Sequence, residues 1–405
     1  MIRPLIRAVT LTAFLLFTPL ASAAPAGAPG IERMVLVMRH GVRTPLHGEV
    51  PDGTRTGAPW PEWKAPDEQI TPHGAKALRA LGEADRRWFA AHGLIPATGC
   101  PDPSAVRIRA NISPRTIESG RDYADGIAPG CALPVSHRME GGADPLFEPL
   151  SAHPAKFDAD AALASIRSFT GGPAALAGRH RAGLDLLETV LACPAPGPCS
   201  PVAPSAVVPT ADGHGISLTG PIRAASGTAQ VLMLEYLEGF PMAKVGWGRA
   251  TPDVLKRLGA VHGALFDVFS RPPYMTAFQM APTVDRILRD FTAKDAPRID
   301  MLVGHDTNVA ALGALLQVPV EAPGFAKGDP SPGGALALAL VRQGDGNPAV
   351  KVWYRSQSAQ AIRAASDQVQ WTPLAIPGCD EGADHLCPLP RFKTLILART
   401  AAARE

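Results

Sequence analysis

Six residues in three separate segments carry side chains that suit phosphate chemistry. Each segment begins as an apolar, strand-like run and ends in a turn that holds arginine or histidine. The six residues are Arg39, His40, Arg43, Arg115, His305 and Asp306. Ligands of α/β sheets bind beyond the carboxyl ends of the strands, so three such ends can converge on one pocket. Because arginine forks bind phosphate oxygens two at a time, we expect a phosphate-bearing small molecule there.

A histidine among arginines is suited to nucleophilic attack. Neighbouring positive charges disfavour imidazolium, so His40 is expected to keep a depressed pKa and to remain a free nucleophile in mild acid. Its imidazole would attack phosphorus and give a phosphohistidine that water then hydrolyses. Asp306 is the natural general acid for the leaving alkoxide, and His305 can donate a further hydrogen bond to the phosphate. Since the arginines neutralise the equatorial oxygens, neither a metal nor another cofactor is expected.

Each segment also has an ordinary structural explanation when it is taken alone. Arg39-His40 can be a surface turn, Asp306 can cap the following helix, and Arg115 can form a surface ion pair. The joint pattern, in this order along the chain, favours a shared pocket. A non-catalytic protein that captures phosphorylated ligands is the alternative function. The presence of both His40 and Asp306 argues against it, because a pure binder needs neither.

The segments that must position these residues indicate an α/β fold. Residues 34–38 form an apolar run typical of a buried strand, residues 106–109 alternate in polarity, and residues 301–303 are again apolar. Further strands are expected at 335–341 and 350–354. A helix is expected to begin near Thr71, with Thr71 as its cap and Pro72 in its first turn. Another helix is expected from about Thr251.

The order of these elements predicts a sheet flanked by helices, with an inserted, mainly helical domain. Residues 155–192 look helical, and residues 193–216 are rich in Pro, Gly and Ser and look irregular. The α/β catalytic domain would comprise residues 24–150 and 265–405, and the insertion residues 151–264. A chain of 405 residues is long for a single core, which agrees with this division.

The amino terminus predicts export. Arg3 and Arg7 precede an apolar run over residues 8–20, and Ala21-Ser22-Ala23 provides a small-residue cleavage signal. We therefore expect a signal peptide over residues 1–23, cleaved after Ala23, and a periplasmic or secreted protein. A buried helix or a membrane anchor is the alternative, but the run is short for a membrane span. A net charge of +2 gives no electrostatic reason to expect a nucleic-acid or membrane partner.

Six cysteines in an exported chain suggest three disulfides. Proximity favours the pairs Cys193/Cys199 and Cys379/Cys387, which leaves Cys100/Cys131. Fifteen pairings are possible for six cysteines, so the connectivity stays open on sequence grounds. Metal binding is the alternative, and neither a Cys-x-x-Cys pair nor a nearby histidine cluster supports it.

Two segments resemble the signatures of a known family. Arg39-His40-Gly41-Val42-Arg43-Thr44-Pro45 resembles the R-H-G-x-R-x-P signature of the histidine acid phosphatases, and residues 304–308 resemble their second, His-Asp signature. Residues 144–147, 238–242, 246–249 and 332–334 are also similar to bacterial periplasmic phytases and glucose-1-phosphatases. Phosphoglycerate mutases share a related R-H-G motif but lack the continuation through Arg43, Thr44 and Pro45.

The resemblance implies a role for each matching residue. His40 would be the nucleophile and Asp306 the proton donor, and the phosphate would be held by Arg39, Arg43, Arg115 and His305. It also implies a phosphoglycerate-mutase-like α/β domain with a helical insertion, three disulfides, and a small-molecule phosphate monoester as substrate.

The residues near the first signature leave the alcohol of the substrate open. Leu46 and Asn111, like residues 238–242, resemble glucose-1-phosphatases, whereas residues 215–220 resemble phytases. His214 lies near the place where glucose-1-phosphatases carry an acidic residue. A phytase gains from basic groups around the pocket, and His47, Lys64, His73 and His214 are candidates for them. Both phytate and a sugar phosphate such as glucose 1-phosphate remain as expected substrates, and the oligomeric state is not predicted.

Overall fold

The structure, a computed structural model, describes residues 30–139, 141–152, 156–194, 196–379 and 384–404. The predicted signal peptide, residues 1–23, lies outside the described residues. Among the residues that are described, no helix is long and apolar enough to cross a membrane.

The central sheet has two halves of opposite character. The parallel half consists of β1 (Gly30–Arg39), β6 (Ile299–Gly304), β2 (Val106–Ala110) and β3 (Val135–Ser136). The antiparallel half consists of β7 (Ala335–Arg342), β8 (Pro348–Gln357), β9 (Val369–Leu374) and β10 (Cys387–Pro388). The strand order is β10-β8-β7-β1-β6-β2-β3, and β9 also pairs with β8. The predicted α/β sheet is confirmed.

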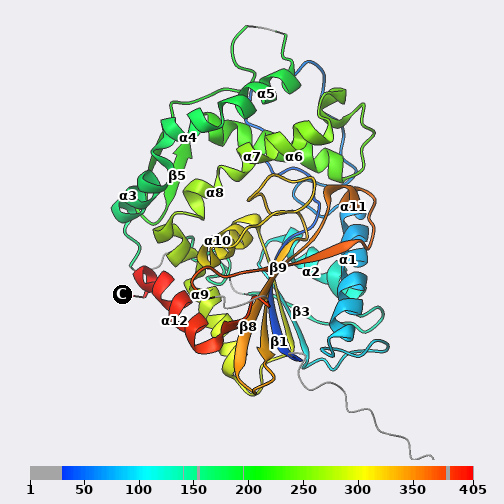
Figure 1. The fold of residues 1–405 in the computed structure, drawn as a ribbon. Helices are drawn as coiled ribbons and strands as arrows, with labels where there is room; N and C mark the ends of the chain where they lie inside the picture. Colours follow the sequence, from blue (N-terminus) through cyan, green and yellow to red (C-terminus); the bar gives the residue numbers. More distant parts are fainter. Residues whose placement is uncertain (1–29, 140, 153–155, 195, 380–383, 405) are drawn as a thin grey trace, which may run out of the picture.

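The apolar run of β1 is buried because helices cover both faces of the sheet (Figure 1). On one face lie α1 (Pro72–Ala91) and α2 (Pro114–Ile127), and on the other lie α9 (Pro273–Thr292), α10 (Asp306–Leu316) and α12 (Leu389–Arg399). Met34, Leu36 and Met38 point into the first core, whereas Val35 and Val37 point into the second. A strand buried on both faces reads as a continuous apolar run.

Local signals begin the helices where the sequence predicts them. The Thr71 side chain accepts a hydrogen bond from the Gly74 amide at 2.9 Å and caps α1, and Pro72 is its first residue. Thr251 caps α7 (Pro252–Gly263) in the same way. Gly126 of α2 lies so close to α1 that a Cβ atom would overlap the carbonyl of Arg79. This contact holds α2, and with it Arg115, against the sheet domain.

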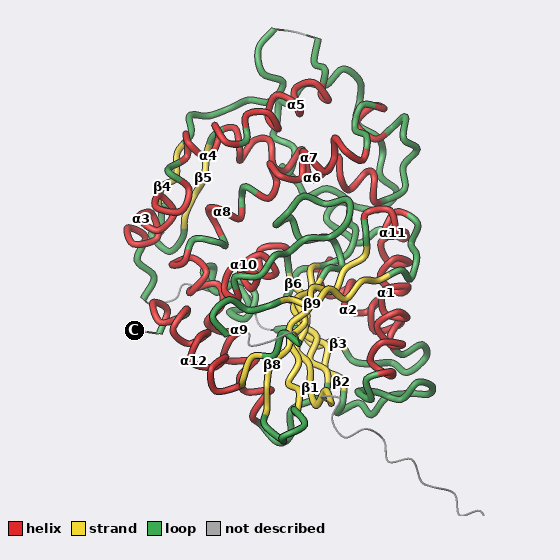
Figure 2. Tube along the Cα trace, viewed as in Figure 1, coloured by secondary structure: helices red, strands yellow, loops and turns green. Residues whose placement is uncertain are grey.

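The predicted insertion, residues 151–264, lies above the carboxyl ends of the parallel strands (Figures 1 and 2). It contains α3 (Ala159–Thr170), α4 (Pro173–Arg179), α5 (Arg181–Leu191), α6 (Pro221–Leu237), a 3-10 turn η1 (Val245–Gly248) and α7. The connection to the last part of the chain includes α8 (Phe266–Phe269), and later short elements are α11 (Ala359–Arg363) and η2 (Ala401–Ala403). One core runs from Val37 of the sheet to Leu232 of α6, so the two parts pack together.

The expectation that residues 193–216 are irregular is wrong in part. β4 (Ala206–Pro209) pairs antiparallel with β5 (Ile216–Thr219) and forms a hairpin. The sequence did not predict β4 because prolines argue against a strand. Pro209 is tolerated here only because it ends a short edge strand. The hairpin turn contains Gly213 at a φ of +71°, which residues other than glycine rarely adopt.

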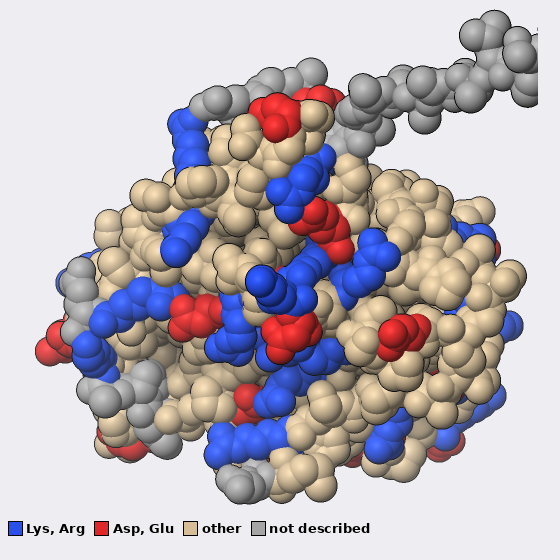
Figure 3. Space-filling view, turned by 90° about the horizontal axis from the view of Figure 1, so that it is seen from below, with Lys and Arg blue, Asp and Glu red and all other residues tan. Residues whose placement is uncertain are grey.

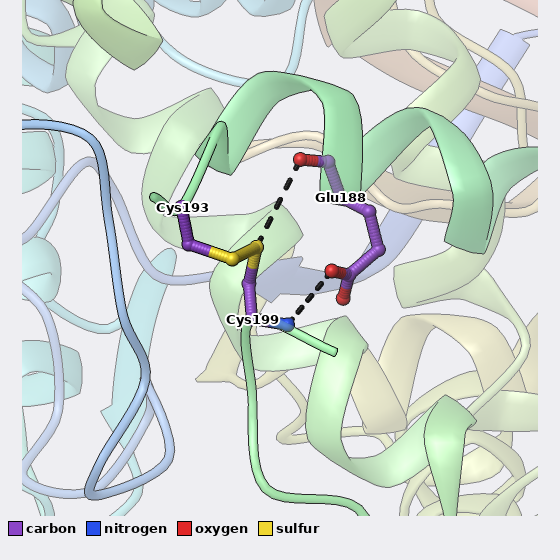
Figure 4. A group of neighbouring side chains, drawn as sticks. All are labelled: Glu188, Cys193 and Cys199. Carbon is purple, nitrogen blue, oxygen red and sulfur yellow. Dashed lines mark hydrogen bonds between the residues drawn. A yellow bond between two sulfur atoms is a disulfide. The ribbon is translucent and has the colours of Figure 1, made fainter. Parts of the chain in front are cut away.

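All three expected disulfides are present: Cys100–Cys131, Cys193–Cys199 and Cys379–Cys387. In the part of the chain that is described, Glu188, Cys193 and Cys199 form the one cluster of metal-ligating residue types. Figure 4 shows that the two sulfur atoms are bonded to each other, and that the Glu188 carboxylate accepts a hydrogen bond from the Cys199 amide at 2.7 Å. Disulfide sulfurs are not thiolates, so this cluster is not a metal site.

Acidic and basic side chains are mixed on the face seen from below in Figure 3. Lys and Arg lie beside Asp and Glu over its centre, in keeping with the net charge of +2.

Candidate active site

The register of the parallel strands brings the three predicted segments together. Arg39 at the end of β1 pairs with Gly304 at the end of β6, and Ala110 at the end of β2 pairs with Val303. The His40 amide donates to the Gly304 carbonyl at 3.0 Å. The residues that follow each strand therefore lie side by side at one edge of the sheet, which the sequence predicts.

His40 is buried, with 3% of its surface exposed. Its Nδ1 atom lies 2.9 Å from the carbonyl oxygen of Gly41. A carbonyl only accepts, so Nδ1 carries the proton and Nε2 keeps its lone pair. Burial first, and then the charges of Arg43, Arg39 and Arg115, hold the pKa of His40 well below its usual value. The side chain is therefore a neutral imidazole with a fixed tautomer.

Arg39 is buried, and both its guanidinium group and its backbone amide are held by neighbouring residues. One guanidinium nitrogen donates to the carbonyl of Pro330, and Nη2 lies 3.0 Å from Oδ2 of Asp306. The Arg39 backbone amide donates to the Gly334 carbonyl at 3.0 Å. The Nε atom of Arg39 has no hydrogen-bond partner among the described residues, which leaves a donor for an anion.

Arg43 makes an ion pair that the sequence analysis missed. Its Nη1 and Nη2 atoms lie 2.7 Å and 2.8 Å from Oε2 and Oε1 of Glu49. This is the two-point geometry in which an arginine also binds phosphate. Nη1 of Arg43 further donates to the Thr44 carbonyl at 2.9 Å.

Arg115 and His305 complete the group. Arg115 is the second residue of α2 and is half-buried; burial and then the charge of Arg43 lower its pKa. The His305 and His40 rings are 5.7 Å apart, and burial followed by the charge of Arg115 lowers the pKa of His305 to about 3. Nδ2 of Asn111 donates to Nε2 of His305 at 2.7 Å, so Nδ1 of that ring carries the proton.

Asp306 is the first residue of α10, and one of its carboxylate oxygens accepts the Thr307 amide at 2.8 Å. Burial alone would raise its pKa. The charge of Arg39, followed by that of His262, instead holds the pKa of Asp306 well below its ordinary value. Without a substrate, Asp306 is therefore an ionised partner of Arg39.

A second pair was also missed by the sequence analysis. His262, near the end of α7, lies with Nε2 at 4.0 Å from Oδ2 of Asp306. Its Nδ1 lies 2.9 Å from Oδ1 of Asp329, and both side chains are buried. The only sequence signal is that His262 follows Leu258 by four residues on the apolar stripe of the helix, where a core residue is expected.

The candidates for substrate specificity lie in three different places. Leu46 and His47 line a hollow together with Arg43, Glu49, His262 and Asp306. Asn111 is buried behind His305, and its Nδ2 also donates to Glu148 at 3.0 Å. His214 is exposed in the β4–β5 turn and lines a separate hollow beside Glu148 and Thr307. The two remaining rim candidates, His73 and Lys64, lie near Glu238, the residue that follows α6, and do not line the hollow around Asp306.

Fold and site together define a class of protein: an α/β sheet whose strand ends gather arginines around a buried, neutral histidine, a set of side chains suited to phosphate esters. Residues 30–159 match the family model of the histidine phosphatase superfamily (branch 2). Phytase AppA of Escherichia coli (strain K12) is 30% identical over 398 residues, which cover 90% of this chain and 91% of that protein. The chain belongs to the histidine acid phosphatases of this superfamily.

Other relatives agree with this assignment. A glucose-1-phosphatase of Salmonella typhimurium is 29% identical over 390 residues, covering 90% of this chain and 92% of that protein. The structure of Hafnia alvei phytase in complex with tartrate superposes with a TM-score of 0.86 at 30% identity, and covers 94% of this chain and 99% of that one. These relatives support a phosphatase over the alternative of a non-catalytic binder.

Proposed function

We propose that the protein hydrolyses phosphate monoesters through a phosphohistidine formed on Nε2 of His40. The observation that carries the proposal is the state of this ring. Its Nδ1 proton is fixed on the Gly41 carbonyl, so Nε2 presents a lone pair among cationic groups that attract a phosphate. A neutral imidazole in this setting needs no general base to become a nucleophile.

Phosphoryl transfer then proceeds in two steps. Arg39, Arg43, Arg115 and His305 hold the phosphoryl oxygens while Nε2 of His40 attacks phosphorus and the bond to the alcohol oxygen breaks. Asp306 gives its proton to the leaving oxygen. Water then attacks the phosphohistidine and returns a proton to Asp306 as the P–N bond breaks. The arginines neutralise the negative charge of the phosphoryl oxygens, so the proposal includes no metal or other cofactor.

Asp306 must be protonated in the first step although Arg39 keeps it ionised in the substrate-free site. In the substrate-free site, Nη2 of Arg39 lies 3.0 Å from the Asp306 carboxylate. A bound phosphate competes for this guanidinium and adds negative charge beside the carboxylate. Both effects raise the pKa of Asp306 when substrate binds. His262, held by Asp329, is the positioning residue on the other side of the carboxylate.

The proposed substrates are phytate and sugar phosphates such as glucose 1-phosphate, in accordance with the names of the relatives. Another structure of the Hafnia alvei phytase, with myo-inositol hexakis sulphate bound, has a TM-score of 0.84 at 29% identity and covers 94% of this chain and 99% of that one. We further propose a periplasmic or secreted location, from residues 1–23, and a division into an α/β domain (24–150 and 265–405) and an insertion (151–264).

The test is hydrolysis of p-nitrophenyl phosphate at mildly acidic pH, with and without EDTA. We expect equal activity in both conditions, and we expect His40→Ala to lose turnover and the acid-labile phosphoenzyme together. Absence of activity in the unchanged protein would reject the enzyme, and loss of activity with EDTA would reject the metal-free mechanism. Near-normal turnover by His40→Ala would reject the nucleophile.

A further inference from the structure

Glu49 binds two of the three nitrogen atoms of the Arg43 guanidinium, and the third, Nε, has no hydrogen-bond partner among the described residues. Its two carboxylate oxygens face the two terminal nitrogens of the guanidinium at 2.7 Å and 2.8 Å, and Oε2 also accepts the Leu46 amide at 2.8 Å. The Glu49 side chain is 8% exposed. A carboxylate so placed is a built part of the pocket and not a solvated surface group.

The backbone of Glu49 is held in place as well as its side chain. The Glu49 amide donates to the Leu46 carbonyl at 3.1 Å, which closes a turn directly after the first signature. Gly227 of α6 packs against this turn, and a Cβ atom there would overlap the Glu49 carbonyl. Glu49 lines the same hollow as Leu46, His262 and Asp306. Its hydrogen bonds to Arg43 and to the Leu46 amide therefore hold a negative charge at the wall of this hollow.

The unpartnered Nε atom of Arg43 lets a phosphate bind this guanidinium while the Glu49 carboxylate stays in place. The negative charge of Glu49 then lies beside the alcohol part of the substrate. A carboxylate accepts hydrogen bonds from hydroxyl groups, but it repels further phosphate groups. Glu49 thus favours an alcohol rich in hydroxyls over one that carries several phosphates.

We propose that Glu49 sets substrate selectivity by charge, favouring sugar monophosphates over polyphosphorylated inositols. This inference rests on the proposed function, since it concerns the alcohol of the same reaction. Glu49 lies outside the signature motifs. It follows Leu46, in the segment whose resemblances leave the alcohol of the substrate open.

The test compares kcat/KM for phytate, glucose 1-phosphate and p-nitrophenyl phosphate in the unchanged protein and in Glu49→Gln. Glutamine keeps the shape and removes the charge. We expect kcat/KM for phytate to rise at least tenfold relative to that for glucose 1-phosphate, and the rise to shrink in high salt. The matched control, Glu83→Gln on the exposed side of α1, is expected to leave all three values unchanged.

A parallel change for all three substrates would overturn the proposal, because it would mean that Glu49 only holds Arg43 in place. Failure of the proposed function is distinct, since the unchanged protein would then not hydrolyse p-nitrophenyl phosphate. A measurement on the unchanged protein covers the case in which Glu49→Gln does not fold. We expect myo-inositol hexakis sulphate to inhibit no more than threefold more tightly than inorganic sulfate, and inhibition thirtyfold tighter would overturn the proposal.

Discussion

At the scale of single residues, Asp306 is the group whose role depends most on the substrate. A leaving alkoxide of high pKa needs its proton, whereas p-nitrophenolate leaves without much help. For Asp306→Asn we expect kcat/KM to fall about a hundredfold with glucose 1-phosphate and less than about tenfold with p-nitrophenyl phosphate. Equal losses with both substrates would show that Asp306 only orients the site.

His262 offers a second test at this scale, through a pH profile. Its charge is one of the causes that lower the pKa of Asp306. In His262→Gln that cause is gone, so the pKa of Asp306 rises and its protonated form persists to higher pH. The descending limb of kcat against pH, which reports the substrate-bound enzyme, is therefore expected to move to higher pH. Asp329→Asn should weaken the same contact, and His92→Gln, at the exposed end of α1, is the control. If the descending limb does not move in His262→Gln, then His262 only packs against its neighbours and does not position Asp306.

The residues that the sequence predicted and those that it missed differ in one physical respect. Arg39 ends a buried strand, and His40 and His305 directly follow one, so the sheet itself places them. Glu49 and His262 reach the site from a turn and from α7, and only tertiary packing makes them partners of Arg43 and Asp306. Residue spacing along the chain does not contain that information.

At the scale of elements, α6 carries a buried acid that links stability to pH. Glu235 is fully buried, accepts the Gly246 amide at 2.9 Å through Oε2, and has no partner at Oε1 among the residues described. Burial raises its pKa from 4.5 to about 8, against the opposing effect of that hydrogen bond. The folded protein therefore keeps a proton that the unfolded chain has already released over this range.

The raised pKa of Glu235 makes the folded protein less stable as the pH rises. A folded state that holds an extra proton loses stability as the pH rises, by about 1.4 kcal/mol per pH unit for one proton. We expect the unfolding free energy to fall more steeply from pH 5 to pH 8 in the unchanged protein than in Glu235→Gln, as measured by urea unfolding. Parallel curves for the two proteins would contradict the raised pKa.

The elements also show where sequence patterns succeed and fail. Helix caps at Thr71 and Thr251, and apolar runs such as that of β1, are local signals, and the structure confirms them. The β4–β5 hairpin was missed because it is short, lies at an edge and ends in Pro209. Its pairing depends on contacts with the surrounding helices rather than on its own composition.

At the scale of the whole molecule, the disulfides are expected to contribute unequally to stability. Cys100–Cys131 closes a loop of 31 residues, and Cys193–Cys199 one of 6 residues. Loop-closure entropy predicts a loss of about 4 kcal/mol when the first is removed and about 2 kcal/mol for the second. Replacing each pair by serine and measuring thermal unfolding tests this order. A larger loss for the shorter loop would contradict it.

The position of β1 in the sheet determines when the central sheet can form during synthesis of the chain. This first strand lies between β6 and β7, which come from the last third of the chain. A growing chain therefore has no partner for its central strand, and no complete site around His40, until the ribosome has made residues 299–342. Pairing between such distant segments is slow. If the protein is exported, as proposed above, the chain would reach the translocation machinery while its central sheet is still unformed and its backbone still extended enough to pass through.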